Sequence, residues 1–180
     1  MSSFARIKLV ARYAKVVYYS IVLTDDDDFE TLENITESLF EFFLKNHTTT
    51  NRAKLNHILE WIKQIGETRG AIVDDFRHEK IASALPPSGK SGKPYFIDSG
   101  KKQPNNLRLY CFPANEHVVF LFNGDIKTKK NAQDCENVRD HFNLANKLTS
   151  CLDKLIVEKD ISWNTDHTDI EFSDDLIFEI

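Results

Sequence analysis

The chain of 180 residues lacks several features that would assign it to familiar protein classes. Its three cysteines, Cys111, Cys135 and Cys151, form no Cys-x-x-Cys pair, so reduced thiols fit better than a disulfide framework or a zinc site. No stretch approaches the roughly 18 to 20 apolar residues that span a bilayer. The first residues do not follow the basic, apolar, small order of a signal peptide. We therefore expect a cytoplasmic protein without membrane contact.

The sequence motifs of the commoner catalytic sites are also missing. There is no Gly-rich phosphate loop, no His-Glu-x-x-His and no nucleophile elbow, which removes most metal, nucleotide-dependent and acyl-transfer enzymes. The acidic run Asp25–Asp28 could suggest a metal site, but consecutive acids before a helix are more typical of a cap and of dipole partners. We expect neither a metal nor a cofactor.

What is present is an ordinary globular composition, with 41% hydrophobic and 28% charged residues. A chain of this length can bury one proper core, whereas two independent domains would each be marginal. The sequence therefore predicts a single domain over residues 1–180, with a core at 7–158 and a β-rich C-terminal extension at 159–180.

The first half of the chain predicts one central strand and a helical hairpin. Val16–Leu23 (VVYYSIVL) is typical of a strand covered on both faces, and Ile7–Arg12 either joins it or forms a short element of its own. Apolar residues then recur every three or four positions in two predicted helices: Phe29 to Phe42, and Leu55 to Ile65, with a cap at Thr50 or Asn51 and a stop at Gly66 and Gly70.

The second half predicts a strand hairpin and a long helix. Asp74–Ala84 is expected to be a third, shorter helix, and the segment up to Asn106 is expected to be loop, except around Tyr95 to Ile97. Leu107–Phe112 and His117–Phe122 are separated by four residues, as in a β-hairpin. Asp134 is expected to cap a helix whose apolar face is Val138, Phe142, Ala145, Leu148, Leu152 and Leu155.

The tail contains three short runs of alternating character, which predict edge strands or a hairpin: Ile161–Trp163, Ile170–Phe172 and Leu176–Ile180. Consecutive strands in a meander imply an antiparallel sheet with helices packed on it. The predicted fold class is therefore α+β, with the helical hairpin and the long helix packed on an antiparallel sheet.

The distribution of charge points to an anionic ligand. Net charge is −5, but residues 84–130 hold eight Lys or Arg and three acids, a balance of +5, while the rest of the chain holds 15 basic and 25 acidic residues. A solvated loop kept soluble by lysines is the alternative explanation. If the ligand is RNA, we expect contacts from Lys90, Lys93, Lys101, Lys102 and Lys130.

Hairpin pairing should bring Arg108 close to Lys127, which follows the second strand. Arg binds a phosphodiester with two parallel hydrogen bonds, and Lys adds charge as the nonbridging oxygens become more negative. RNA cleavage through the 2′-hydroxyl needs only a base, an acid and charge stabilisation, without a metal. The candidate catalytic residues are Arg108, Lys127, Lys129 and Tyr110, with His117 and His141 in reserve. Tyr110 has the alternative role of a core aromatic, and His141 that of a solvent-facing residue.

The order of these motifs resembles the RelE/HigB-like toxins of the RelE/ParE superfamily, from type II toxin–antitoxin systems. The resemblance rests on Leu107–Phe112, a strand with Arg, on the apolar strand Val118–Phe122 with Asn123-Gly124, and on Lys127–Lys130 before a helix. Two helices between the first strand and the remaining sheet also match. The motifs cover residues 107–148, and the topology extends back to Val16.

The resemblance implies a toxin-like mRNA endoribonuclease, associated with the ribosome and held inactive by a cognate antitoxin. Arg108 would match the family's sheet arginine, and Lys127 with Thr128 its basic segment after the strand. The alternative is a non-catalytic domain of toxin-like fold whose acidic faces and aromatic tail bind a protein partner. The oligomeric state does not follow from the sequence.

Overall fold

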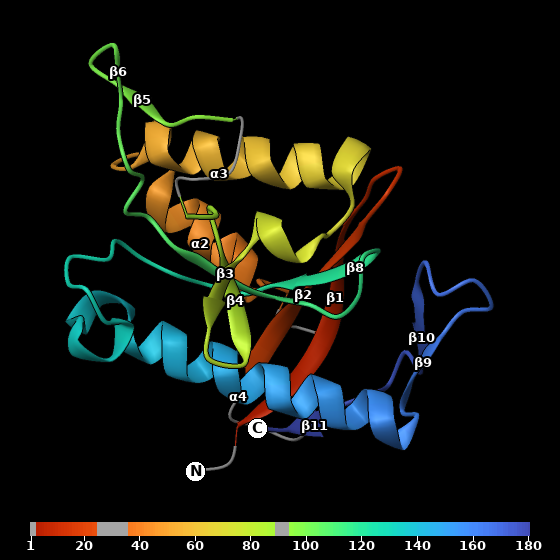
Figure 1. The fold of residues 1–180 in the computed structure, drawn as a ribbon. Helices are drawn as coiled ribbons and strands as arrows, with labels where there is room; N and C mark the ends of the chain where they lie inside the picture. The colour runs from red at the N-terminus through yellow and green to blue at the C-terminus, as the bar shows by residue number, and fades with distance from the viewer. Residues whose placement is uncertain (1–2, 25–35, 89–93) are drawn as a thin grey trace.

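The computed structural model describes residues 3–24, 36–88 and 94–180. Over these ranges the fold is mixed α+β, with three α-helices around a mostly antiparallel sheet. Figure 1 shows one long helix on one face of the sheet and two helices on the other. The helices are α2 (Leu39–His47), α3 (Arg52–Gln64) and α4 (Glu136–Glu158).

The main sheet has the strand order β11-β1-β2-β8-β7-β4-β3. Neighbouring strands are antiparallel except β2 and β8, which are parallel, so the prediction of a purely antiparallel sheet is wrong at this pair. The reason is that a long crossover, which includes α2, α3, β3, β4 and β7, joins β2 to β8 and allows the two strands to run in the same direction. The bounds are β1 (Phe4–Arg12), β2 (Val17–Thr24), β3 (Arg77–Glu79), β4 (Ala82–Leu85), β7 (Leu109–Pro113), β8 (Val118–Leu121) and β11 (Phe178–Glu179).

Strand β2 lies inside the sheet, as its continuous apolar sequence predicted. Tyr19 faces α4, while Tyr18 faces α2 and α3. The Tyr18 hydroxyl donates a hydrogen bond to the Ile62 carbonyl of α3 at 2.7 Å, so this buried polar group is satisfied. The earlier segment forms a separate strand, β1, that pairs antiparallel with β2.

Helix α4 covers one face of the sheet with the six apolar residues that helical spacing predicted, and all six are buried. Its N-cap position is Cys135 rather than Asp134. Asp134 instead ends a 3₁₀ turn over Ala132–Asp134, where its carboxylate accepts a hydrogen bond from Asn131. Over the described ranges, no helix combines the length and the apolar character that a bilayer span requires.

On the other face, α2 begins later than the apolar spacing predicted. Ser38 and Glu41 form a capping box: Ser38 Oγ accepts from Glu41 N at 3.3 Å, and Ser38 N donates to Glu41 Oε2 at 2.7 Å. Residues 36–38 are therefore not helical, and the predicted start at Phe29 lies outside the described residues. Helix α3 is confirmed; it continues as a π-helical turn and stops at Gly70, whose φ is 77°.

The prediction of a helix over Asp74–Ala84 is wrong. A 3₁₀ turn at Val73–Asp75 leads into the antiparallel hairpin of β3 and β4, with Lys80 at φ 69° in its turn. Ala, Glu, Lys and His are compatible with a helix, but β4 pairs with β7 through Ser83 to Cys111 and Ala84 to Tyr110. These long-range pairings override the local preference.

The remaining strands form two ribbons and one sheet edge. Residues 97–102 form a small ribbon of β5 (Ile97–Asp98) and β6 (Lys101–Lys102). In the tail, all three predicted strand segments are confirmed: β9 (Ile161–Trp163) pairs with β10 (Ile170–Phe172), and β11 adds an edge to β1.

Asp169 connects the β9–β10 ribbon to strands β1 and β2 of the main sheet. It accepts hydrogen bonds from the Tyr19 hydroxyl at 2.6 Å and from the Arg12 guanidinium. Burial would raise the pKa of Asp169, but the hydrogen bonds from Arg12 and Tyr19 outweigh it, and the pKa is lowered. The ionised carboxylate therefore stabilises the folded state.

We predict that Asp169→Asn lowers the free energy of unfolding at neutral pH, because Arg12 and Tyr19 lose a charged acceptor. The loss should be only about 1 kcal/mol, since water screens the half-exposed Arg12 side chain. A carboxylate with a lowered folded pKa stabilises above its unfolded pKa of about 3.9, and this stabilisation is lost as pH falls through the folded value. Urea unfolding of both proteins between about pH 7 and pH 3 measures this. The difference should shrink in acid, and Asp174→Asn, an exposed control, should show none. A difference that is constant with pH would contradict the linkage.

Candidate anion-binding pocket

The backbone brings the Arg108 segment against the chain that follows β8, as hairpin register predicted. Arg108 N donates to the Asp125 carbonyl at 3.0 Å, and Lys127 N donates to the Asn106 carbonyl at 2.8 Å. Gly124 lies so close to this segment that an added Cβ would stand 1.8 Å from the Arg108 carbonyl oxygen. Only glycine fits there without moving the backbone.

The loop with Lys127, Lys129 and Lys130, here called the lysine loop, contacts the start of α4. Thr128 N and Oγ1 each lie 3.4 Å from Cys135 Sγ. These contacts, above all the one from the Thr128 hydroxyl, lower the pKa of the buried Cys135 thiol to about 7. Asn137 Nδ2 of α4 also donates to the Ile126 carbonyl at 3.2 Å. Both contacts hold the lysine loop at the N-terminal end of α4.

The β3–β4 hairpin supplies the opposite side. Arg77 Nε donates to the Pro86 carbonyl at 2.8 Å, and Nη2 to the Pro87 carbonyl at 3.4 Å. Burial lowers the pKa of Arg77, and Glu79 opposes this shift. At the tip, Asn146 Oδ1 of α4 accepts from the backbone amides of Ile81 and Ala82, at 2.9 and 3.0 Å. The hairpin is therefore held from both ends.

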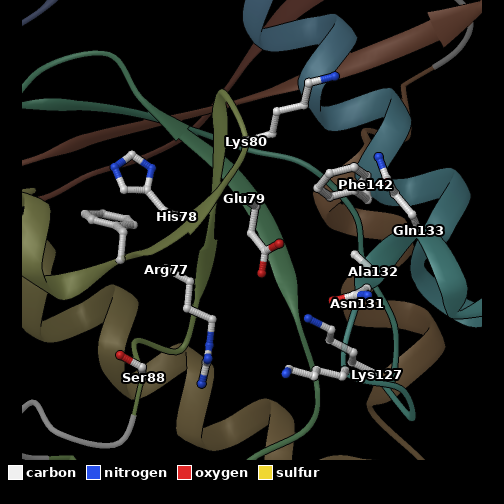
Figure 2. A pocket seen from close by; sticks show the side chains of 12 residues that line it. Arg77, His78, Glu79, Lys80, Ser88, Lys127, Asn131, Ala132, Gln133 and Phe142 are labelled. Carbon is white, nitrogen blue, oxygen red and sulfur yellow. The ribbon is translucent and has the colours of Figure 1, made fainter.

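Between the hairpin and the lysine loop lies a pocket of about 640 Å³. Figure 2 shows Arg77 and Lys127 extending from opposite walls, with the Glu79 carboxylate between these walls. Four cations and one carboxylate line it, together with polar and apolar side chains. The lining residues are Phe76, Arg77, His78, Glu79, Lys80, Ser88, Lys127, Lys130, Asn131, Ala132, Gln133 and Phe142.

Most charged side chains of the pocket have no partner among the residues that the structure describes. Within the described ranges, Lys80, Lys127, Lys130 and Glu79 make no side-chain hydrogen bond or ion pair. Four positive groups around one negative group in a concave site attract an anion. Arg77 adds donors whose direction its two carbonyl contacts have already set.

Arg108 and Tyr110, both predicted to be catalytic, lie behind the pocket rather than in its lining. Arg108 is 9% exposed, and its Nη1 donates to the carbonyls of Asn105 and Leu107 at 2.6 and 3.1 Å. Burial, reinforced by nearby Arg77, lowers its pKa to about 10. Tyr110 is fully buried, and burial first, then Glu79, raises its pKa. Among the residues that the structure describes, Arg108 Nε and the Tyr110 hydroxyl have no hydrogen-bond partner.

The structure separates the remaining predicted residues. Lys130 lines the pocket with Lys127, whereas Lys129 is exposed and does not. Lys101 and Lys102 lie on the β5–β6 ribbon beyond α3, on the face of the sheet opposite α4 (Figure 1). Lys102 Nζ stands 3.5 Å from the centre of the Tyr95 ring. Lys90 and Lys93 lie outside the described residues.

The reserve histidines are not pocket residues. His117 Nδ1 lies 3.0 Å from the Lys15 carbonyl. Burial lowers the pKa of His141, which is half-buried on α4. Neither side chain lines the pocket.

Arg77, Glu79 and Lys80 were missed by the sequence reasoning because their segment was interpreted as a helix. The turn Lys80-Ile81 contains none of the Gly, Asn or Asp residues that mark a two-residue hairpin turn, so the sequence offered no local signal of it. The described residues contain no group of three His, Cys, Asp or Glu side chains able to hold a metal ion. No family model, no curated protein and no solved structure matches this chain.

We predict that Asn146→Ala lowers the free energy of unfolding by about 2 kcal/mol, because two backbone amides of the hairpin tip lose their acceptor. Chemical denaturation measures the loss, and amide hydrogen exchange should be faster at Ile81 and Ala82. The matched control is Asn143→Ala, an exposed asparagine on the same helix, which should change stability by less than about 0.5 kcal/mol. Equal effects of the two substitutions would show that the tip contact is unimportant.

Proposed function

We propose that this protein is an endoribonuclease that binds a phosphodiester of RNA in the pocket and cleaves it without a metal. The supporting observation is the Glu79 carboxylate, which lines the pocket together with Arg77, Lys127 and Lys130 and has no side-chain partner within the described ranges. A carboxylate is a suitable general base, and the cations suit a phosphate that gains negative charge during the reaction.

The proposed reaction is an internal transfer at phosphorus. Glu79 removes the proton of the 2′-hydroxyl, and the 2′-oxygen forms a bond to phosphorus while the bond from phosphorus to the 5′-oxygen breaks. Arg77 and Lys127 stabilise the charge on the nonbridging oxygens. The departing 5′-oxygen takes a proton from the Lys130 ammonium group. The products are a 2′,3′-cyclic phosphate and a free 5′-hydroxyl, so protons and bonds balance.

The resemblance to RelE/HigB-like toxins supports the same chemistry and adds its biological setting. Two helices follow β2, and the β7–β8 hairpin with Arg108 precedes the lysine loop and α4, as in the motif order of that superfamily. On this basis mRNA on the ribosome is the proposed substrate, and a cognate antitoxin is the proposed protein partner. Lys127 is common to the motif and to the pocket.

We predict that Glu79→Gln lowers the rate of RNA cleavage by about 10²-fold or more, because an amide does not accept the 2′-hydroxyl proton. RNA affinity should stay the same or increase, since the substitution removes a negative charge from a site for an anion. Single-turnover cleavage and binding of a labelled RNA oligonucleotide measure the two effects. Cleavage at the native rate by Glu79→Gln would refute the role of Glu79 as the base.

The two pocket lysines allow a matched test of RNA binding. Lys127→Ala with Lys130→Ala should weaken RNA binding and reduce the slope of log Kd against log salt by about 1 to 1.5, because two phosphate contacts are lost. Lys101→Ala with Lys102→Ala removes the same charge from the ribbon on the opposite face and should leave the pocket's binding intact. Equal losses in the two double variants would place the RNA outside the pocket. No RNA binding by the native chain would favour the protein-interaction alternative.

A further inference from the structure

The β5–β6 ribbon is joined to helix α3 through one histidine. Residues 94–106, here called the ribbon segment, include the β5–β6 ribbon, which lies beyond α3 as seen from the sheet (Figure 1). His57 of α3 contacts the segment near both of its ends. His57 Nε2 lies 3.1 Å from the Pro94 carbonyl oxygen, and His57 Nδ1 lies 3.0 Å from Asn105 Nδ2. Both ring nitrogens of His57 therefore take part in holding the segment on α3.

The Asn105 side chain determines which atom it presents to the histidine. Asn105 is 5% exposed; its Nδ2 also donates to the Lys54 carbonyl at 3.0 Å, and its Oδ1 accepts from the Leu107 backbone amide at 3.0 Å. A carbonyl only accepts and a backbone amide only donates, so turning the Asn105 amide around would lose both bonds. Asn105 therefore presents an N–H group to His57, and His57 Nδ1 must carry a lone pair to accept it.

The Pro94 carbonyl completes the assignment of the histidine protons. It only accepts a hydrogen bond, so His57 Nε2 must carry the proton. The neutral imidazole with its proton on Nε2 satisfies both contacts. A protonated imidazole carries N–H on both nitrogens, and its Nδ1–H would point at the Asn105 N–H group, donor against donor. Protonation of His57 is therefore incompatible with the contact to Asn105.

The surroundings of His57 also disfavour its charged form. Burial lowers the pKa of the half-buried His57, and the Pro94 carbonyl opposes this shift. The buried Phe96 ring of the ribbon segment lies against the imidazole, with 5.7 Å between the ring centroids. Within the described part of the chain, the charged side chains nearest to His57 along α3 and those of the ribbon make no contribution to this shift. They are Lys54 and Glu60 on α3, and Asp98, Lys101 and Lys102 on the ribbon segment.

We propose that His57 is a pH-sensitive switch for the β5–β6 ribbon: the neutral imidazole holds the ribbon segment on α3, and the protonated imidazole releases it. Release breaks the contact between His57 and Asn105 and exposes the Phe96 ring to water. It also frees Lys101 and Lys102 from their position beyond α3. This inference goes beyond the proposed function and does not rest on it.

The direction of the pH effect follows from the protonation state of each form. In the released segment His57 is free to protonate near the ordinary histidine pKa of about 6.5, whereas in the held segment its pKa is lower. The held form is therefore fully favoured above about pH 6.5, and this advantage is lost as pH falls from there through the lower pKa of the held form.

Nitrogen-15 NMR of the native chain measures the tautomer directly. At about pH 7.5 His57 should carry its proton on Nε2, and its titration midpoint should lie below the ordinary value of about 6.5. A proton on Nδ1 at that pH would overturn the proposal, because Nδ1 could not then accept from Asn105.

Amide hydrogen exchange measures the release. The Leu107 amide donates to Asn105 Oδ1, so it loses its acceptor when Asn105 moves away from α3. Its protection factor, which is corrected for the intrinsic effect of pH on exchange, should fall several-fold between about pH 7.5 and about pH 5.5. A protection factor that stays constant over this range would show that the segment is not released.

Two variants test the role of the imidazole. His57→Gln does not titrate and should abolish the pH dependence at Leu107, whereas His78→Gln, at an exposed histidine, is the matched control and should retain it. Asn105→Asp still offers an acceptor to the Leu107 amide but places a carboxylate next to His57 Nδ1. It should raise the His57 midpoint and reverse the pH dependence, since protonated His57 then has an acceptor on both sides.

Persistence of the native pH dependence in His57→Gln, or an unchanged direction in Asn105→Asp, would overturn the switch. If the buried carboxylate prevents Asn105→Asp from folding, His57→Gln decides the test. That variant replaces a half-buried ring with an uncharged side chain whose amide can still donate to the Pro94 carbonyl.

Discussion

The parallel pairing of β2 with β8 is the contact on which the rest of the fold depends. It joins the β1–β2 hairpin to the group formed by β8, β7, β4 and β3, which would otherwise be two separate small sheets with exposed edges. Register places Tyr18 beside Val119 toward α2 and α3, and Tyr19 beside Phe120 toward α4. Each helical layer therefore packs on residues from both halves of the chain, and the end of β8 directs the lysine loop to the start of α4.

The candidate pocket contrasts with this scaffold, because the interactions that build it leave Glu79 and its three lysines without a partner among the described residues. Asn146 and the proline carbonyls hold the β3–β4 hairpin, and Thr128 with Cys135 holds the opposite loop. The cations of the pocket are close to one another and share one carboxylate, which by itself disfavours folding. A group of like charges of this kind is retained when well-packed neighbouring residues fix the backbone that carries them. Unfavourable local arrangements are typical of functional sites.

The buried positions of Arg108 and Tyr110 show how far strand register alone predicts a site. Pairing across the β7–β8 turn correctly placed the Arg108 backbone beside the segment that leads to Lys127. Whether the side chain reaches solvent depends on β3, β4 and α4, which cover that face and come from distant parts of the sequence. The same dependence hid Arg77 and Glu79, because local composition favoured a helix where pairing with β7 makes a strand.

The sequence by itself determined those elements whose pattern is strong and local. Strand β2, helices α3 and α4, the β7–β8 hairpin and the three tail strands follow from periodicity, caps and turns, since burial of one face requires that spacing in any context. Only the tertiary structure decided the β3–β4 hairpin, the parallel pairing of β2 with β8 and the lining of the pocket. These depend on contacts between residues far apart in the chain, such as Asn146 with Ile81 and Tyr110 with Ala84. The pattern of a short segment does not reveal such contacts, because they form only when distant parts of the chain come together.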